Sequence, residues 1–74
     1  MDKIALIYKD AIEMAFNLKD SQLLNATVDY DKDTWNVEIK EEDGIYNMEI
    51  EGFFIRSCFK WLLKGGKKGW NQMI

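Results

Sequence analysis

The period of the hydrophobic pattern changes near residue 24 and again near residue 52, and this change constrains the fold most. Three runs between these points alternate apolar and polar side chains, which is typical of strands with one buried face. Their apolar members are Leu24, Ala26, Val28 and Tyr30, then Trp35, Val37 and Ile39, then Tyr46, Met48 and Ile50. Asp43-Gly44 suits a tight turn because glycine readily takes a positive φ. The pattern predicts a three-stranded antiparallel meander.

A helix is predicted on each side of this meander. Over residues 2–20, apolar residues recur at helical spacing, with a second apolar strip beside them. The first stripe is Ile4, Ile7, Tyr8, Ala11, Ala15 and Leu18, and the second is Ala5, Ile12 and Phe16. From about Gly52, the predicted core face is Phe54, Cys58, Trp61 and Leu62, flanked by Ile55 and Phe59. Gly65-Gly66 is expected to end this helix.

The order α-β-β-β-α predicts an α+β fold in which two helices cover one face of the sheet. With 74 residues, the chain is expected to form a single domain, residues 1–74. Residues 65–74 are expected to be flexible or to form one short extra turn. Cys58 is the only cysteine and faces the predicted core, so we expect a buried and unreactive thiol.

The composition argues against an enzyme. There is no histidine and one cysteine, so the sequence offers no catalytic triad, no Cys/His dyad and no tetrahedral zinc set. We therefore expect no catalytic residues, no metal and no cofactor. No signal peptide and no apolar run of about 20 residues are recognisable, and a free thiol suits a reducing compartment. The expected location is the cytoplasm, of a bacterial host cell if the protein comes from a phage.

The net charge of −3 conceals a strong segregation. Residues 29–51 hold nine acidic residues against Lys32 and Lys40, whereas residues 52–74 hold five basic residues and no acid. The alternation places Asp29, Asp31, Glu38, Glu49 and Glu51 on the open sheet face. Such charges either keep the sheet soluble and deter edge pairing, or form a surface for a basic partner. The candidate partner-binding acids are Asp29, Asp31, Asp33, Glu38, Glu41, Glu42, Asp43 and Glu49. Ile45, among them on the open face, is a candidate apolar anchor.

Two alternatives remain open. A basic patch formed by Arg56, Lys60, Lys64, Lys67 and Lys68 would suit a small nucleic-acid-binding accessory protein. An apolar patch formed by Ile12, Phe16 and Trp61 would suit a homodimeric structural module. Double-stranded RNA-binding domains share the element order, but their lysines lie at the start of the last helix, where this chain has Glu49 and Glu51.

The segment Gly69-Trp70-Asn71-Gln72, after a Phe-rich helix that contains Phe54-Ile55-Arg56-Ser57, resembles a family of small phage-encoded anti-CRISPR proteins that inhibit type II CRISPR nucleases. Their element order is also similar. The resemblance implies an acidic DNA mimic that occupies the site where the nuclease reads its short DNA motif. The family continues into an acid-rich C-terminal helix, whereas this chain stops at Ile74 after a basic segment. The expected function is therefore non-catalytic inhibition of a nucleic-acid-handling protein through the acidic sheet and turns.

Overall fold

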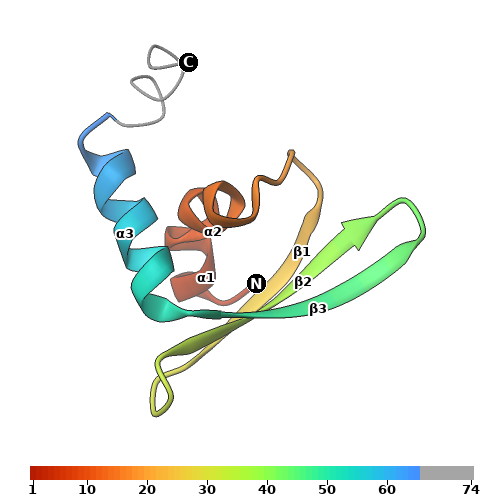
Figure 1. The fold of residues 1–74 in the computed structure, drawn as a ribbon, viewed down its shortest axis with the longest axis horizontal. Coiled ribbons are helices and arrows are strands. Elements are labelled where there is room, and N and C mark those ends of the chain that lie inside the picture. Colours follow the sequence, from red (N-terminus) through yellow and green to blue (C-terminus); the bar gives the residue numbers. More distant parts are fainter. Residues whose placement is uncertain (66–74) are drawn as a thin grey trace.

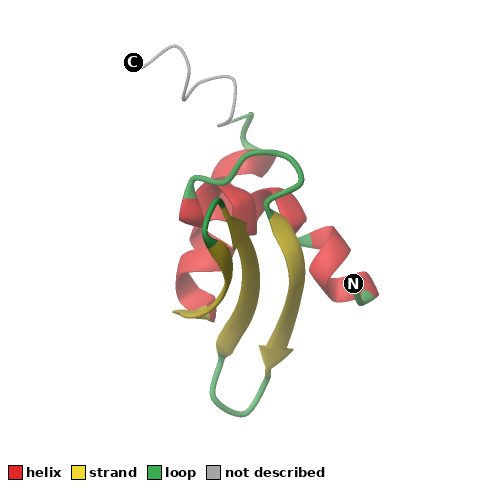
Figure 2. Cartoon of the chain, turned by 90° about the vertical axis from the view of Figure 1, so that its right-hand side faces the viewer, coloured by secondary structure: helices red, strands yellow, loops and turns green. Residues whose placement is uncertain are grey.

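The computed structural model describes residues 1–65 and shows helices on one side of a three-stranded sheet (Figure 1). The elements, in chain order, are α1 (Lys3–Ile7), α2 (Lys9–Phe16), β1 (Leu23–Asp29), β2 (Thr34–Glu41), β3 (Gly44–Glu51) and α3 (Gly52–Leu63). Figure 2 looks toward the strands, with the helices behind them. The predicted α+β class is confirmed.

The sheet is the predicted antiparallel meander, with strand order β1-β2-β3. β2 is the central strand, and its side chains Trp35, Val37 and Ile39 are all buried. Residues 42 and 43 form the turn between β2 and β3, and Glu41 pairs with Gly44 across it. Gly44 has a φ of 149°, which confirms the need for glycine at this position.

β1 does not follow the predicted alternation at its start. Its register with β2 shifts between Leu23 and Asn25, so that Leu24 is the extra residue of a β-bulge. As a result, Leu23 is buried, whereas Leu24 is exposed. Tyr30, predicted to end the apolar row, lies beyond the strand in the turn and is also exposed.

The predicted first helix is two helical segments, separated at Tyr8. The backbone there has φ −94° and ψ 6°, outside the helical range. The Tyr8 ring lies 5.8 Å from the ring of Trp35 and 4.6 Å from that of Phe59, between centroids. The bend therefore coincides with an aromatic side chain that packs against both the sheet and α3.

The buried side of α1 and α2 draws on both predicted strips. Ala5 and Ile12, from the second strip, and Ala11, from the first, are buried, whereas Ile7 is 61% exposed. The prediction that Ile7 faces the core is wrong, because the apolar surface of these helices is wider than the side that the core covers and Ile7 lies outside that side.

α2 ends at Phe16, earlier than the predicted helical region, which extends to residue 20. Asn17 adopts the left-handed conformation, with φ 55°. The N–H of Leu18 donates to the carbonyl of Glu13, and that of Asn17 donates to the carbonyl of Met14. This is a Schellman motif with asparagine in the position that glycine usually takes.

α3 packs on the core through Ile55, Cys58, Phe59 and Leu62, a stripe at i, i+3, i+4 and i+7. The prediction placed Phe54 and Trp61 on this face, but both are exposed at its flank. Gly65, with φ 75°, follows the helix and donates its N–H to the carbonyl of Leu62, as expected for a C-terminal glycine. Apart from Gly65, the segment predicted as flexible or as an extra turn lies outside the described residues.

No residue separates β3 from α3, and the junction is closed by Asp33 from the β1–β2 turn. The N–H of Gly52 donates to the Asp33 carbonyl at 2.7 Å. Arg56, one turn into α3, donates to both carboxylate oxygens of Asp33, at 2.6 and 2.9 Å. A Cβ on Gly52 would overlap the Asp33 carboxylate. A larger residue at position 52 would therefore displace the Asp33 carboxylate from this junction.

We predict that Ile12→Ala lowers the free energy of unfolding by about 2–5 kcal/mol, because it leaves a cavity in the core. Ile7→Ala removes the same atoms from an exposed position, and its effect should stay within about 0.5 kcal/mol. Urea denaturation followed by tryptophan fluorescence measures both. Equal losses would contradict the described phase of α1 and α2.

We predict that Gly52→Ala destabilises the fold by about 1–3 kcal/mol, because the new methyl group displaces the Asp33 carboxylate. The effect should shrink in an Asp33→Gly background, which removes the overlapping group and tolerates the left-handed backbone at residue 33. Thermal denaturation of the two single variants and the double variant measures this coupling. Additive losses would show that the contact does not constrain the junction.

Candidate partner-binding surface

The open face of the sheet carries four of the predicted acids. The pairing places the open-face residues in cross-strand rows: Asn25, Glu38 and Asn47; Thr27, Asn36 and Glu49; Asp29, Thr34 and Glu51; Lys40 and Ile45. The prediction that Asp29, Glu38, Glu49 and Glu51 share this face is confirmed. Asp31 was predicted with them, but lies in the turn after β1. We call the face formed by Asp29, Glu38, Glu49 and Glu51 the acidic face.

Neutral residues separate the carboxylates of the acidic face. Glu38 lies between Asn25 and Asn47, and Glu49 lies opposite Asn36. Like charges directly opposite each other destabilise a sheet, and this arrangement avoids every such pair on the face. Among residues 1–65, the ion pairs are Lys9 with Glu13 and Arg56 with Asp33, so the acidic face keeps its charge within the described part of the chain.

Asp29 also shapes the turn next to this face. Its Oδ1 accepts hydrogen bonds from the N–H groups of Asp31 and Lys32, at 3.0 and 3.2 Å. This is the local bonding by which aspartate stabilises a turn. Asp31 itself is exposed. Asp29 therefore has a structural role in addition to its charge.

Asp33 and Arg56 belonged to two different candidate sites, and the structure joins them instead. Their bidentate ion pair leaves neither as a free charge for a partner of opposite sign. The partner-binding role predicted for each of them stays a prediction, and each would meet a partner as half of an exposed ion pair and not as an isolated charge. Sequence separation concealed this pair: only the return of α3 toward the β1–β2 turn brings the two side chains together.

Glu41, Glu42 and Asp43 form a second acidic group at the tip of the β2–β3 hairpin. With Lys19, Ser21, Gln22, Lys40 and Tyr46 they line an open polar hollow of about 980 Å³. The Tyr46 hydroxyl donates to Asp43 at 2.8 Å. This bond, with smaller effects of burial and of the Glu41 charge, raises the pKa of Tyr46. The tip lies on the opposite side of the molecule from α3 (Figure 1).

The alternative basic patch is only partly within the described residues. Lys60 is exposed on α3 and Lys64 is exposed directly after it, whereas Lys67 and Lys68 lie outside residues 1–65. With Arg56 paired to Asp33, the described part of the patch holds two unpaired cations.

The alternative dimer patch is wrong as predicted. Ile12 is fully buried, and Phe16 is partly buried against the core. Trp61 alone of the three is exposed. The buried side of α2 includes Ile12 together with Ala11 of the predicted core stripe, so the second strip was not spare apolar surface.

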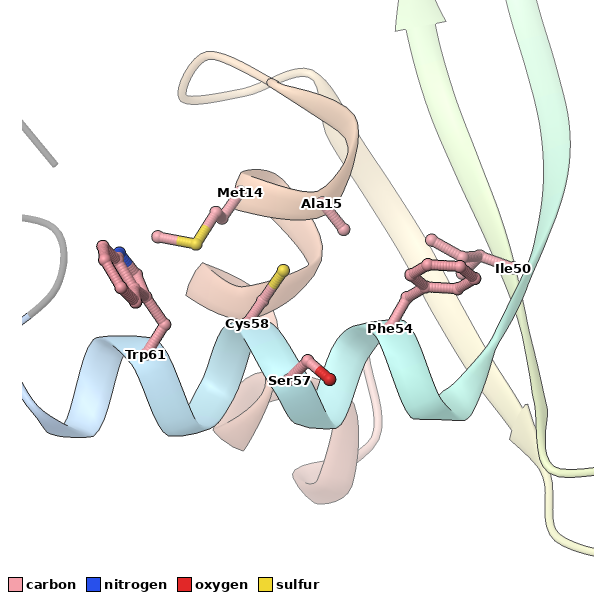
Figure 3. A pocket seen from close by; sticks show the side chains of 7 residues that line it. All are labelled: Met14, Ala15, Ile50, Phe54, Ser57, Cys58 and Trp61. Atoms are coloured by element: carbon pink, nitrogen blue, oxygen red, sulfur yellow. The ribbon is translucent and has the colours of Figure 1, made fainter. Parts of the chain in front are cut away.

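The sequence pattern did not predict the apolar surface between α2 and α3. An open groove of about 420 Å³ lies between α2 and α3 and is lined by Met14, Ala15, Ile50, Phe54, Ser57, Cys58 and Trp61. Figure 3 shows Trp61 and Met14 at one end, Cys58 in the middle, and Ile50 against Phe54 at the other end. Burial raises the pKa of the Cys58 thiol, in line with the expected unreactive side chain. A separate open hollow of about 360 Å³ lies farther along β3, and its lining includes Met48 and Tyr46, which are 44% and 45% exposed.

The sequence contained one sign of this surface. Tyr46, Met48 and Ile50 occupy the last strand of a meander, which is an edge strand. Side chains on an edge strand are buried only if a helix or another segment packs over that edge. The three helices leave Tyr46 and Met48 of this strand nearly half exposed. The expected core role of Tyr46 and Met48 is therefore only partly met.

The described residues contain no group of three or more His, Cys, Asp or Glu side chains arranged to hold a metal ion. None of the helices within residues 1–65 is long and apolar enough to cross a membrane.

Comparison of the chain with protein-family models, with curated proteins and with solved structures finds no match.

We predict that the Asp33–Arg56 pair makes stability depend on acid pH. Hydrogen bonds from Arg56 hold the pKa of the Asp33 carboxyl below its ordinary value of 3.8. A lowered pKa means that the pair stabilises the fold above that value and loses its effect as the pH falls through the folded-state pKa. Arg56→Met should therefore be less stable than the wild type at pH 7, and the difference should shrink as the pH falls below 3.8.

Urea titrations between pH 2.5 and pH 7 measure this difference. Lys60→Met serves as the matched control, because Lys60 is an exposed cation on the same helix outside this pair. A difference between Arg56→Met and the wild type that stays constant with pH would show that the ion pair does not stabilise the fold.

Proposed function

We propose that the protein is a non-catalytic binding domain whose acidic face docks on the basic surface of a nucleic-acid-handling protein and blocks it. The observation that carries this proposal is the acidic face itself: Glu38, Glu49 and Glu51 lie on adjacent strands of one sheet face, without cationic partners among residues 1–65. The proposed class is an inhibitor similar to the anti-CRISPR proteins that the C-terminal segment resembles.

The geometry of a sheet supports binding to a surface that normally holds nucleic acid. Glu49 and Glu51 are successive side chains on one face of β3, about 6.8 Å apart, and Glu38 is a diagonal neighbour of Glu49, at about 7–8 Å. A nucleic acid backbone also presents a row of closely spaced negative charges, and basic sites are built to neutralise them. Neutral Asn and Thr side chains between the acids add hydrogen-bonding groups without adding charge.

Two further acidic groups extend the surface beyond the sheet. Asp31 lies at the β1–β2 end, and Glu41, Glu42 and Asp43 lie at the β2–β3 tip. Together with the acidic face they form a band along the strands. Ile45, exposed on the same face, is the apolar side chain within it and remains the proposed anchor.

The competing function, direct binding of nucleic acid through α3, has less support. Asp33 neutralises Arg56, and the remaining described cations of α3 are Lys60 and Lys64. Two exposed lysines give a weak phosphate-binding surface, since affinity for nucleic acid grows with the number of neutralised phosphates.

The test is binding of the purified chain to a guide-loaded type II CRISPR nuclease, in competition with DNA that carries the short motif read by the nuclease. We expect Glu38→Lys/Glu49→Lys to weaken binding at least about a hundredfold, because it places like charges together at the interface. Wild-type binding should also weaken as salt rises from 0.1 to 0.5 M.

The matched control is Asp2→Lys/Asp10→Lys, which makes the same change in net charge at exposed positions on the helical side of the molecule. It should bind nearly as well as the wild type. Equal binding by wild type and Glu38→Lys/Glu49→Lys would exclude the acidic face. If the chain binds nucleic acid but not the nuclease, and if Lys60→Glu/Lys64→Glu abolishes that binding, the competing function is supported instead.

A further inference from the structure

The two edges of the sheet are built differently. The β-bulge at Leu24 interrupts β1, and bulges are one of the features that prevent an edge from pairing with another strand. β3 pairs with β2 without a shift from Gly44 to Glu51, and it contains no lysine, no proline and no bulge. β3 therefore presents a regular eight-residue edge.

The face of β3 that points toward the helices is apolar and mostly uncovered. Tyr46, Met48 and Ile50 lie opposite the buried Ile39, Val37 and Trp35 of β2, so they share the core side of the sheet. Only Ile50, next to α3, is half-buried, whereas Tyr46 and Met48 remain nearly half exposed. An edge strand with an exposed apolar row is a surface that another strand covers well.

If the covering strand is β3 of a second copy, the charges on the open face of β3 restrict the register in which the two strands pair. Glu49 and Glu51 must not lie opposite acids, since like charges directly opposite each other are destabilising. Antiparallel pairing about Glu49 or Ile50 brings Glu49 opposite Glu49 or Glu51 of the second copy. Pairing about Met48 instead places Glu49 opposite Asn47 and Glu51 opposite Ile45.

We propose that two copies of this chain associate through β3, antiparallel and with Met48 on the two-fold axis, to form a continuous six-stranded sheet. This inference concerns the edge and the apolar side of the sheet, and it does not depend on the proposed function of the acidic face.

The same register covers the apolar surface of both copies. Met48 faces Met48 of the second copy, and Tyr46 faces Ile50 of the second copy. Because Ile50 lies against Phe54 at the end of the apolar groove (Figure 3), the Tyr46 ring of the second copy reaches this end of the groove. In this register Glu49 lies opposite Asn47 of the second copy, just as it lies opposite Asn36 within its own sheet.

The test is the mass of the purified chain in solution, by sedimentation equilibrium between about 1 and 500 µM. We expect a dimer whose dissociation constant rises at least about a hundredfold in Met48→Lys, which brings two ammonium groups together on the axis. Ile45→Lys is the matched control on the same strand, because its side chain lies on the opposite face and meets Glu51 of the second copy. It should dimerise as well as the wild type or better.

Salt separates this association from the proposed function. Dimerisation brings two acidic sheets together, so raising the salt from 0.05 to 0.5 M should tighten it by screening their repulsion. Docking on a basic protein should weaken under the same change. Failure of either interaction can thus be recognised without reference to the other.

A cysteine cross-link tests the register itself. In a Cys58→Ser background, Met48→Cys should form an intermolecular disulfide readily, because residues on the axis lie directly opposite each other. Glu49→Cys in the same background lies opposite Asn47 of the second copy and should cross-link much more slowly. A monomer at every concentration, a dimer unaffected by Met48→Lys, or equal cross-linking at both positions would overturn the proposal.

Discussion

The direct junction between β3 and α3 determines which surfaces of this molecule are covered. Because no linker intervenes, the direction of α3 follows from the end of β3 and from the contacts that Gly52 makes with Asp33. The Arg56 pair then fixes the first turn of the helix against the β1–β2 turn. α3 is thereby held beside α2, with Ile55 fully buried in the core, and does not run along β3.

The position of α3 leaves the core covered unevenly. The helices bury the inner side chains of β2, and the aromatic contacts of Tyr8 with Trp35 and Phe59 join all the layers. The outer half of β3 lies beyond their reach, with the hairpin tip on the far side of the molecule from α3 (Figure 1). A domain of 74 residues has a small core and depends on burying most of its apolar side chains. The exposed apolar row on β3 therefore leaves out stabilisation that a covering segment would supply.

The sheet could be predicted because its information is local. Trp35, Val37 and Ile39 alternate with polar residues, and Asp43-Gly44 specifies its turn, so the class and the strand order followed from the sequence. The two errors in phase have local causes that periodicity does not contain. One extra residue at Leu24 shifts the start of β1. In the first helical region the apolar surface is wider than the side that the core covers, so spacing alone does not show that Ile12 is buried and Ile7 exposed.

The candidate site was harder to predict because it depends on contacts between distant residues. The open-face position of Glu38 and Glu49 followed from strand alternation alone. The pairing of Asp33 with Arg56 did not, since 23 residues separate them and each belonged to a surface of one charge. Charge runs in a sequence show which charges are abundant, but the tertiary fold decides which of them are neutralised.

The spacing of charges on the acidic face also bears on how the edge strand β3 can pair. The acidic face avoids directly opposed carboxylates by placing Asn or Thr between them, and the same spacing on β3 allows a second copy to add its strand without a direct clash of charge. Such a dimer would place two acidic faces side by side and so double the length of the charged surface. A longer row of carboxylates increases attraction to an extended basic channel more than to a compact basic patch, because screening limits each charge to neighbours within about 10 Å. Self-association through the apolar side of β3 would therefore favour partners shaped to hold nucleic acid.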